Sequence, residues 1–292
     1  MIKRGLLTAL CLGISLAVTM PPAWATALSD VINTLETPFQ PGTDAEYQIL
    51  DYSADFFQKS KIASLDRLQR ADGRVEVAFD YQPELTGRPV PTVKFRWQYE
   101  SPTTQEIVSN GINMWVYLPE NSQVIQSNID QANKAEQNDP MAFLTGLGNL
   151  SRDFLINWGD PSQDVDGNFV LEMTPRRTSS LINKLIIVVD RFAVESYQNR
   201  GKEMPFGDPA IAPPPRRNYA TGKNFALPGD DQDSGALWFP ILSTTVYDPN
   251  NNSTIIEFSN LRVNYGIPDT AFEFNIPAGV QVIQPTGKEM GF

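Results

Sequence analysis

The side chains that could do chemistry in this sequence are carboxylates, hydroxyls and amines, because histidine is absent and the single cysteine is Cys11. The absence of histidine excludes Ser-His-Asp and Cys-His catalysis, histidine-ligated zinc and histidine general bases. Carboxylate pairs, a Ser-Lys pair and an unusual tyrosine remain available, but none leaves a recognisable signature, and the 34 acidic residues show no spacing that singles out one pair. We therefore expect a protein that is not an enzyme, with no catalytic residue and no cofactor.

An acidic run of Asp230, Asp231 and Asp233 offers the ligand type that calcium prefers. The run lacks the ligand spacing of a known calcium loop. It lies in the segment 198–235, which is rich in proline and glycine and is typical of a long surface loop between strands. A solvated acidic loop is the favoured interpretation, calcium binding is the lesser one, and no metal site is predicted.

Aromatic side chains gather in the stretch from Val93 to Pro119. Apolar Val93, Phe95, Trp97 and Tyr99 alternate with four polar residues, which predicts a strand with one dry and one wet face. After a turn the chain returns through Ile107 and Val108 to a second aromatic cluster formed by Met114, Trp115 and Tyr117. The dry face is either an ordinary core or a surface that holds an apolar ligand.

The elements that position these residues follow from the same period-two alternation. Strands are predicted over 50–56, 75–81, 123–126, 154–158, 169–173, 185–190, 242–247, 254–265 and 272–276. Turns are predicted at Asp72-Gly73, Asp166-Gly167 and Asn250-Asn251-Asn252. A short amphipathic helix is predicted to begin with Ser29 as its N-cap and to end before Pro38.

A second helix is predicted to begin at Asp139 and Pro140. Its apolar stripe, at helical spacing, comprises Met141, Phe143, Leu144, Leu147, Leu150 and Phe154. Gly146 and Gly148 weaken such a helix by about 1 kcal/mol each relative to alanine. It is either a plug in the open end of a barrel or a movable cover.

Residues 1–25 have the three parts of a secretory signal peptide. Lys3 and Arg4 are followed by the apolar stretch 6–20 and by the small-x-small site Ala23-Trp24-Ala25. We expect cleavage after Ala25 and a soluble mature protein, because no second apolar run of membrane-spanning length follows.

Cleavage at that site changes the composition of the chain. It removes Cys11, so the mature protein has neither thiol nor disulfide. It also removes Lys3 and Arg4, which changes the formal charge from −11 to −13. An acidic protein of this kind disfavours nucleic acid and anionic membrane surfaces as partners, and we expect a monomer.

The order of the motifs resembles the LolA family of periplasmic carriers of outer-membrane lipoproteins. The similar runs are Phe56-Phe57-Gln58, Arg88-Pro89, Phe95-Arg96-Trp97-Gln98-Tyr99, Ile107-Val108-Ser109-Asn110-Gly111, Met114-Trp115-Val116-Tyr117, Pro140-Met141-Ala142-Phe143-Leu144 and 272–283. The resemblance covers about 28–283, apart from the proline-rich insertion. Each run alone is weak, and their common order makes the signal specific.

The resemblance implies a mainly β protein with few helices, folded as an incomplete, half-open antiparallel β-barrel with a helical lid over a hydrophobic cavity. It implies one such domain over 26–292, with the insertion at about 198–235, located in the periplasm. The implied partners are the acyl chains of lipoproteins, an inner-membrane lipoprotein-release transporter and an outer-membrane acceptor.

The resemblance also implies roles for individual residues. Arg88, in its Arg-Pro context, matches an arginine that hydrogen-bonds the lid backbone, and Arg96 is the alternative latch. The implied cavity lining comprises Phe56, Phe79, Phe95, Trp97, Tyr99, Trp115, Tyr117, Met141, Phe143, Leu144 and Leu147, extended by Trp238, Phe239 and Pro240. For any one of these side chains, an ordinary core position is the alternative.

Two other functions remain open from the sequence. A carrier of phospholipid or glycolipid could use the same fold, and a structural envelope protein could fill the same barrel with its own side chains. A lipid-sized apolar void would favour a carrier, and a filled interior would favour the structural protein.

Overall fold

The computed structural model describes residues 26–81, 91–128, 147–179, 182–200 and 238–284. Its strands are β1 (Asp51–Ile62), β2 (Arg67–Asp80), β3 (Thr92–Ser101), β4 (Gln105–Ser109), β5 (Asn113–Leu118), β6 (Gln123–Asn128), β7 (Phe154–Gln163), β8 (Phe169–Pro175), β9 (Lys184–Val189), β10 (Ile241–Tyr247), β11 (Ser253–Val263) and β12 (Gln281–Ile283).

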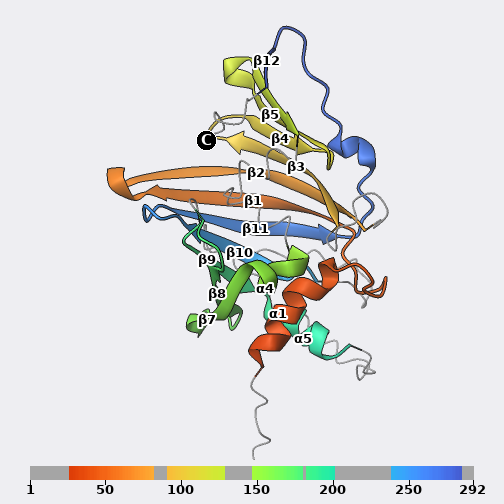
Figure 1. Cartoon of the computed structure of the whole chain (residues 1–292), viewed down its shortest axis with the longest axis vertical. Coiled ribbons are helices and arrows are strands. Elements are labelled where there is room, and N and C mark those ends of the chain that lie inside the picture. The colour runs from red at the N-terminus through yellow and green to blue at the C-terminus, as the bar shows by residue number, and fades with distance from the viewer. Residues whose placement is uncertain (1–25, 82–90, 129–146, 180–181, 201–237, 285–292) are drawn as a thin grey trace, which may run out of the picture.

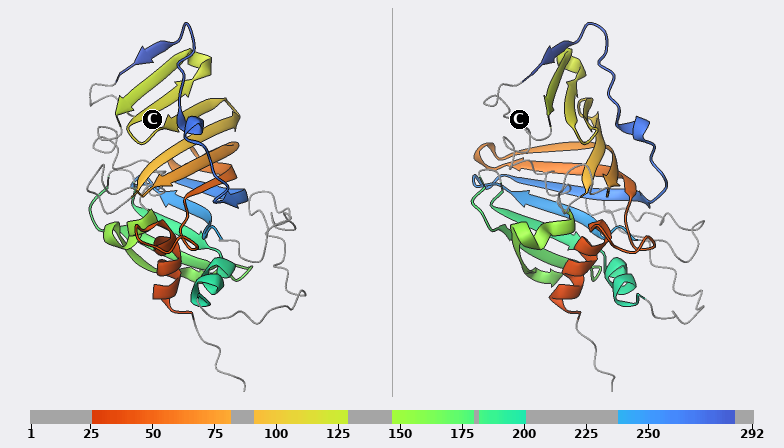
Figure 2. Two further views of the ribbon diagram at one scale, coloured as in Figure 1. Left: turned by 90° about the vertical axis from the view of Figure 1, so that its right-hand side faces the viewer. Right: turned by 45° about the vertical axis from the view of Figure 1, so that its right-hand side comes forward.

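All twelve strands form one sheet, in the order β12-β6-β5-β4-β3-β2-β1-β11-β10-β9-β8-β7. Neighbouring strands are antiparallel, except that β12 runs parallel to β6. The sheet is curved, and β12 and β7 form its two edges instead of pairing with each other (Figures 1 and 2). This confirms the prediction of a mainly β fold with an incomplete antiparallel barrel.

The helices lie over the β7–β11 half of the sheet (Figures 1 and 2). They are α1 (Leu28–Glu36), α4 (Leu150–Asp153) and α5 (Arg191–Gln198), with the 3-10 turns η1 (Thr37–Phe39) and η5 (Leu147–Asn149). α1 packs beside α5, where Gln198 donates a hydrogen bond to the carboxylate of Asp30 at 2.9 Å. The predicted N-cap is wrong by two positions, because Ala27 precedes the helix and Ser29 lies in its first turn.

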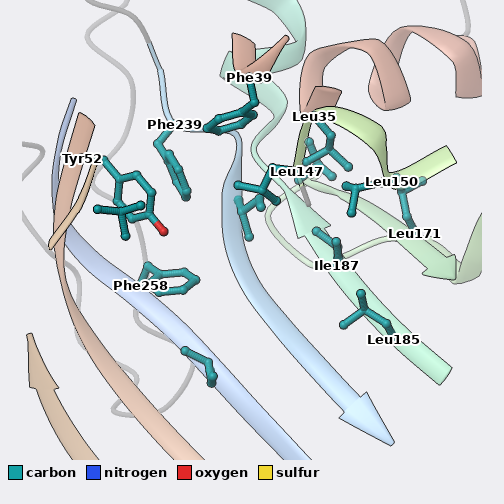
Figure 3. Close-up of a cluster of buried hydrophobic side chains, with 14 of the residues drawn as sticks. Leu35, Phe39, Tyr52, Leu147, Leu150, Leu171, Leu185, Ile187, Phe239 and Phe258 are labelled. Carbon is teal, nitrogen blue, oxygen red and sulfur yellow. The ribbon is translucent and has the colours of Figure 1, made fainter. Parts of the chain in front are cut away.

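The face of the sheet toward α1 is called the inner face here, and the opposite face the outer face. The core on the inner face is aromatic at its centre, where Phe239 lies beside Tyr52 with Phe39 and Phe258 near it (Figure 3). The ring centroids of Phe239 and Tyr52 are 4.3 Å apart. Leucine and isoleucine side chains from α1, η5, α4, β8 and β9 pack beside this aromatic centre (Figure 3). Phe239, predicted as an addition to the cavity lining, lies on the inner face as a buried core residue.

The C-terminal residues 264–283, called the strap, cross the outer face from β11 to β12 (Figures 1 and 2). The buried carboxylate of Asp51 accepts hydrogen bonds from the backbone N–H groups of Tyr265 and Gly266, at 3.0 and 3.1 Å. The strap ends as β12, whose N–H at Gln281 donates to the carbonyl of Ser122 at 2.9 Å. These contacts fasten both ends of the strap to the sheet.

The strand predicted over 272–276 is wrong. Residues Asp269–Phe272 form the 3-10 turn η6, and residues 273–276 have no strand partner. The reason is that the carbonyls of Ala271 and Glu273 accept hydrogen bonds from the side chain of Arg96 instead of from a neighbouring strand.

The turn predicted at Asp72-Gly73 is also wrong, because both residues lie inside β2. The hairpin between β1 and β2 instead turns at η2 (Ala63–Leu65) and at Asp66, whose φ is 46°. Gly73 is needed for another reason. A Cβ atom at this position would lie 1.9 Å from the carbonyl oxygen of Gln98, so β3 can approach β2 this closely only beside glycine.

Two other predicted turns are confirmed, at Asp166-Gly167 and at residues 250–252. The helix α5 was not predicted, and its last residue, Gln198, is the first residue of the predicted loop. Residues 201–237, which include the acidic run at Asp230, lie outside the described part of the chain. Among the described residues, no helix is long and apolar enough to cross a membrane.

Candidate functional site

Strand register brings five of the predicted cavity residues together on the inner face. Val75 of β2 pairs with Trp97 of β3, and Val77 pairs with Phe95, which fixes the direction of every second side chain. The five residues on this face are Phe56, Phe79, Phe95, Trp97 and Tyr99. The ring of Phe56 lies 4.6 Å from that of Trp97 and 5.0 Å from that of Tyr99, measured between centroids.

These five side chains differ in how far they are covered. Phe56, Phe79 and Trp97 are buried to 6% exposure or less among the protein's own side chains. Phe95 and Tyr99 are only partly buried, although both pack against the same core. Of this group, Phe95 and Tyr99 thus keep apolar surface that a ligand can contact.

The inner face continues across β4, β5 and β6 with further apolar side chains. Ile107 pairs with Trp97, Val116 pairs with Ile107, and Ile125 pairs with Val116, so all lie on the inner face. We define the β3–β6 wall as the partly buried apolar residues of this face, which are Phe95, Tyr99, Ile107, Leu118 and Ile125. Ile107, Leu118 and Ile125 were missing from the predicted lining.

Trp115 and Tyr117 lie on the outer face, so the prediction that they share a cavity with Trp97 is wrong. Trp115 pairs with Val108, and Tyr117 pairs with Glu106, whose neighbours on β3 are the outward-facing Arg96 and Gln98. The strap covers both aromatic rings, because Phe274 lies 6.1 Å from the ring of Trp115 and 5.9 Å from that of Tyr117. They form a second, smaller core with Val108, Val124 and Val280.

Arg96 does not lie near the inner face, which corrects its alternative assignment as the lid latch. Its guanidinium donates to the carbonyl of Ala271 at 2.5 Å and to that of Glu273 at 2.7 Å, and it pairs with the carboxylate of Glu106. Arg96 therefore fastens the strap to the outer face.

The preferred latch, Arg88, lies outside the described residues, and so do Met141, Phe143 and Leu144 of the predicted lid. Leu147 is described and is buried in the main core. The segment after the predicted lid is fixed to α1, because the carboxylate of Glu36 accepts hydrogen bonds from the backbone N–H of Ser151 at 2.5 Å and from its hydroxyl at 3.0 Å. These hydrogen bonds hold the start of α4 against α1.

A polar row crosses the inner face beyond the aromatic residues. The hydroxyl of Tyr99 donates to the side-chain oxygen of Gln58 at 2.9 Å, and the amide nitrogen of Gln58 donates to Ser60 at 3.2 Å. Ser60 shares a hydrogen bond of 3.1 Å with Thr254. The inner face is thus apolar toward the helices and polar, with its groups partnered, toward the β1–β2 hairpin.

Several buried polar side-chain atoms have no hydrogen-bond partner within the described residues. Those in the aromatic part of the core are the hydroxyl of Tyr52 and the indole nitrogen of Trp97, both on residues at 1% exposure or less. Desolvation by burial raises the pKa of Tyr52 well above its ordinary value of about 10. The centre of this core is therefore a strongly apolar environment.

This burial predicts an alkaline weakening of the fold that Tyr52→Phe should reduce. Below pH about 10 the hydroxyl is protonated in both states, whereas above it the unfolded chain loses the proton first, so the free energy of unfolding falls as the pH rises. We expect Tyr52→Phe to flatten this fall and to be neutral or stabilising at neutral pH, because the hydroxyl has no partner in the described structure. Urea denaturation as a function of pH measures both effects.

Tyr81→Phe is the matched control, since burial also raises the pKa of Tyr81 but its hydroxyl donates to the carbonyl of Ile49 at 2.6 Å. That variant should lose about 1 kcal/mol at neutral pH. Equal losses for the two variants at neutral pH would contradict the assignment of an unpartnered hydroxyl at Tyr52.

The described residues of the inner face present an apolar surface with a polar border. Among them, no cluster of three or more acidic or other metal-ligating side chains is arranged to hold a metal ion. Chemically, the inner face can bury hydrocarbon and can offer hydrogen bonds at one border.

Comparison with known families gives a match on the strands that carry this face. The family described as outer membrane lipoprotein carrier protein LolA matches residues 48–195, which is just over half of the 292 residues. The matched part runs from the residues before β1 into α5 and includes the whole β3–β6 wall.

Individual relatives align over longer stretches. An outer-membrane lipoprotein carrier protein of Pseudomonas aeruginosa is 22% identical over 284 residues, which cover 97% of this chain and 99% of the relative. That of Chromohalobacter salexigens is 23% identical and covers 82% of this chain and 83% of the relative. The solved structure of a LolA superfamily protein from Nitrosomonas europaea, 14% identical, covers 86% of this chain and 99% of that chain, with a TM-score of 0.36.

Proposed function

We propose that this chain, which belongs to the LolA family of outer membrane lipoprotein carrier proteins, is a periplasmic carrier that holds lipoprotein acyl chains against its inner face. In this proposal residues 26–292 form one monomeric, non-enzymatic domain after signal cleavage. It receives cargo from an inner-membrane lipoprotein-release transporter and passes it to an outer-membrane acceptor. The observation that carries the proposal is the partly exposed apolar β3–β6 wall in a member of this family.

The physical need for such a carrier lies in the cost of hydrating the lipid anchor. Each methylene exposed to water costs about 0.8 kcal/mol, so an acylated lipoprotein cannot cross an aqueous compartment with bare chains. A wall of Phe95, Ile107, Leu118 and Ile125 supplies large, non-directional burial without charged partners. A surface of this kind can bind acyl chains of different lengths. It can also release them to an acceptor that binds them with higher affinity.

The polar row supports a direction for the bound lipid. Gln58, Ser60 and Thr254 provide hydrogen-bonding groups next to the ring of Tyr99. Ester and amide groups of a lipid anchor need such partners when they leave water. We propose that the acyl chains lie on the β3–β6 wall, with the polar end of the anchor toward this row. Arg88 remains the proposed latch of a lid formed by the residues around 139–146.

A pair of variants on opposite faces tests the proposed site. Phe95→Ser removes a partly buried aromatic ring from the inner face, and Tyr117→Ser removes one from the outer face of the same sheet. We expect Phe95→Ser to weaken binding of a fluorescent acyl probe about 10-fold, because the probe loses its apolar contact with one aromatic ring. Tyr117→Ser should leave probe affinity within about 2-fold of the wild type, because its ring lies under the strap.

The binding is measured by fluorescence titration of the mature proteins, with denaturation midpoints checked for both variants. Equal losses in the two variants would show that the probe does not depend on the inner face. A larger loss in Tyr117→Ser would place the apolar site under the strap and would overturn the proposed arrangement.

A further inference from the structure

The tip of the β1–β2 hairpin, residues Lys59–Arg70, differs in charge from the remainder of the chain. It contains Lys59, Lys61, Arg67 and Arg70 against the single acidic residue Asp66, a formal charge of +3 within a chain of −11. All other residues together therefore carry −14. The tip is a local cationic site on a strongly acidic protein.

The hairpin geometry places these cations at one exposed end of the sheet. The β2–β3 ladder ends where Asp72 pairs with Ser101, so residues 67–71 extend past β3 on that side. Figure 1 shows the tip projecting beyond the turn between β10 and β11. Lys61, Arg67 and Arg70 are exposed, and Lys59 is partly buried.

A shallow groove of about 420 Å³ lies at this tip. It is lined by Lys59, Lys61, Asp66, Arg67, Leu68, Ser253 and Ile255. The one ion pair within it joins Lys61 and Asp66 at 3.7 Å, and their side chains are 56% and 92% exposed. Because both groups are so exposed, this pair holds its partners weakly and leaves the lysine available to another anion.

Two leucines are exposed at the same tip. The exposed fraction is 67% for Leu65 and 41% for Leu68, whereas Tyr52, Phe56 and Phe79, which lie nearer the core on β1 and β2, are buried. Leucines beside lysines and arginines are the composition with which a protein segment enters the headgroup region of a bilayer. Exposed leucines alone, or exposed cations alone, would be ordinary on a protein surface. At this tip the two kinds of residue occur within six residues of each other.

We propose that the β1–β2 tip is a membrane-contact site that binds the anionic phospholipid surface of a bilayer. Lys59, Lys61, Arg67 and Arg70 would contact lipid phosphates, and Leu65 and Leu68 would enter the headgroup layer. This site goes beyond carriage of lipid, because it lies on the hairpin end and its binding does not depend on what the inner face holds.

The acidity of the whole chain does not oppose this contact at the tip. Charges more than a Debye length apart, about 8 Å at physiological salt, are largely screened from each other. The tip cations therefore act locally on the lipid surface, and acidic surface farther than this length from the bilayer opposes them little. Acidic surface is repelled only when it comes within this length, so the tip is the part of the protein that faces the bilayer.

Vesicle co-flotation of the mature protein tests this proposal. Phosphatidylcholine vesicles with and without phosphatidylglycerol are compared for the wild type, for K61Q/R67Q/R70Q at the tip, and for R74Q/R191Q/R262Q, which removes the same charge elsewhere. We expect the wild type to prefer the anionic vesicles at least about 10-fold, the tip variant to lose this preference, and the control to keep it. L65S/L68S should weaken binding while its salt dependence remains.

Each other outcome counts against the proposal. It is overturned if the wild type shows no preference for anionic vesicles, or if the tip and control variants lose binding equally. Salt-sensitive binding of the tip to poly-glutamate without binding to vesicles would assign it to an acidic protein partner instead. Unchanged denaturation midpoints exclude unfolding as the cause of a loss.

Discussion

Replacing Phe239 with alanine should lower the free energy of unfolding by about 3–5 kcal/mol. Phe239 is 2% exposed and contacts the rings of Tyr52, Phe39 and Phe258, with centroids 4.3, 6.2 and 6.3 Å away. These neighbours come from β1, η1 and β11, so no single element can move to fill the space that the ring leaves. The loss therefore combines the transfer of the ring with the cost of a cavity.

Urea denaturation of the mature protein measures this loss, with Phe239→Leu as the control. Leucine keeps most of the apolar volume, and the control should lose less than half as much as the alanine variant. A loss below about 1 kcal/mol for Phe239→Ala would mean that the ring is not part of a packed core. In that case the core of the inner face would not be centred on these aromatic rings.

Replacing Arg96 with methionine should release the strap and lower the free energy of unfolding by about 2–3 kcal/mol. The Arg96 side chain is 17% exposed and supplies the hydrogen bonds to the carbonyls of Ala271 and Glu273. Its removal leaves these carbonyls without that donor and leaves the carboxylate of Glu106, 21% exposed, without its cation. Charged hydrogen bonds at low exposure are worth more than surface pairs.

Hydrogen exchange of the backbone amides in the strap measures the release directly. We expect faster exchange at residues 269–283 in Arg96→Met, while β7 to β10 keep wild-type rates. Lys94→Met is the matched control, because Lys94 reaches the same strap at Asp269, whose side chain is 80% exposed, at 2.8 Å. It should cost less than about 1 kcal/mol. Equal exchange in both variants would contradict the role given to Arg96.

Sequence periodicity predicted the sheet well because most strands have one buried face. The alternation in β1, β2 and β3 identifies Phe56, Phe79 and Trp97 as one face without reference to their partners. The family resemblance added the open barrel, which alternation alone does not distinguish from a closed one. Neither pattern states whether an inward side chain is covered by its neighbours, and this is why Trp97 and Phe95 differ in exposure.

The error at Trp115 and Tyr117 arose at a turn. Three residues, 110–112, separate β4 from β5, and Ser109 pairs with Met114, so Met114 instead of Trp115 continues the inner face. Counting the residues of the turn around Asn110 and Gly111 could have given the correct register. The signal was Asn110, which caps the turn by accepting hydrogen bonds from the N–H groups of Ile112 and Asn113. A hydrophobic cluster without its register cannot be assigned to one face.

The strap and α5 were missed for different physical reasons. The strap has no strong local pattern, since residues 273–280 follow the outer face through contacts with Arg96, Trp115 and Tyr117 that are distant in sequence. α5 did have a local signal, because Asp190 caps it by accepting a hydrogen bond from the N–H of Phe192 at 2.8 Å. Its aspartate was instead assigned to the end of the preceding strand.

Native mass spectrometry of the mature protein, purified gently from its own envelope and followed by fragmentation of any bound molecule, tests lipoprotein carriage. We expect a bound acylated lipoprotein, or its acylated N-terminal peptide, that is depleted in Phe95→Ser and retained in Tyr117→Ser. Bound phospholipid or glycolipid without lipoprotein would contradict lipoprotein carriage and assign another cargo to the inner face. A bare protein that also takes up no acyl probe would contradict the carrier function itself.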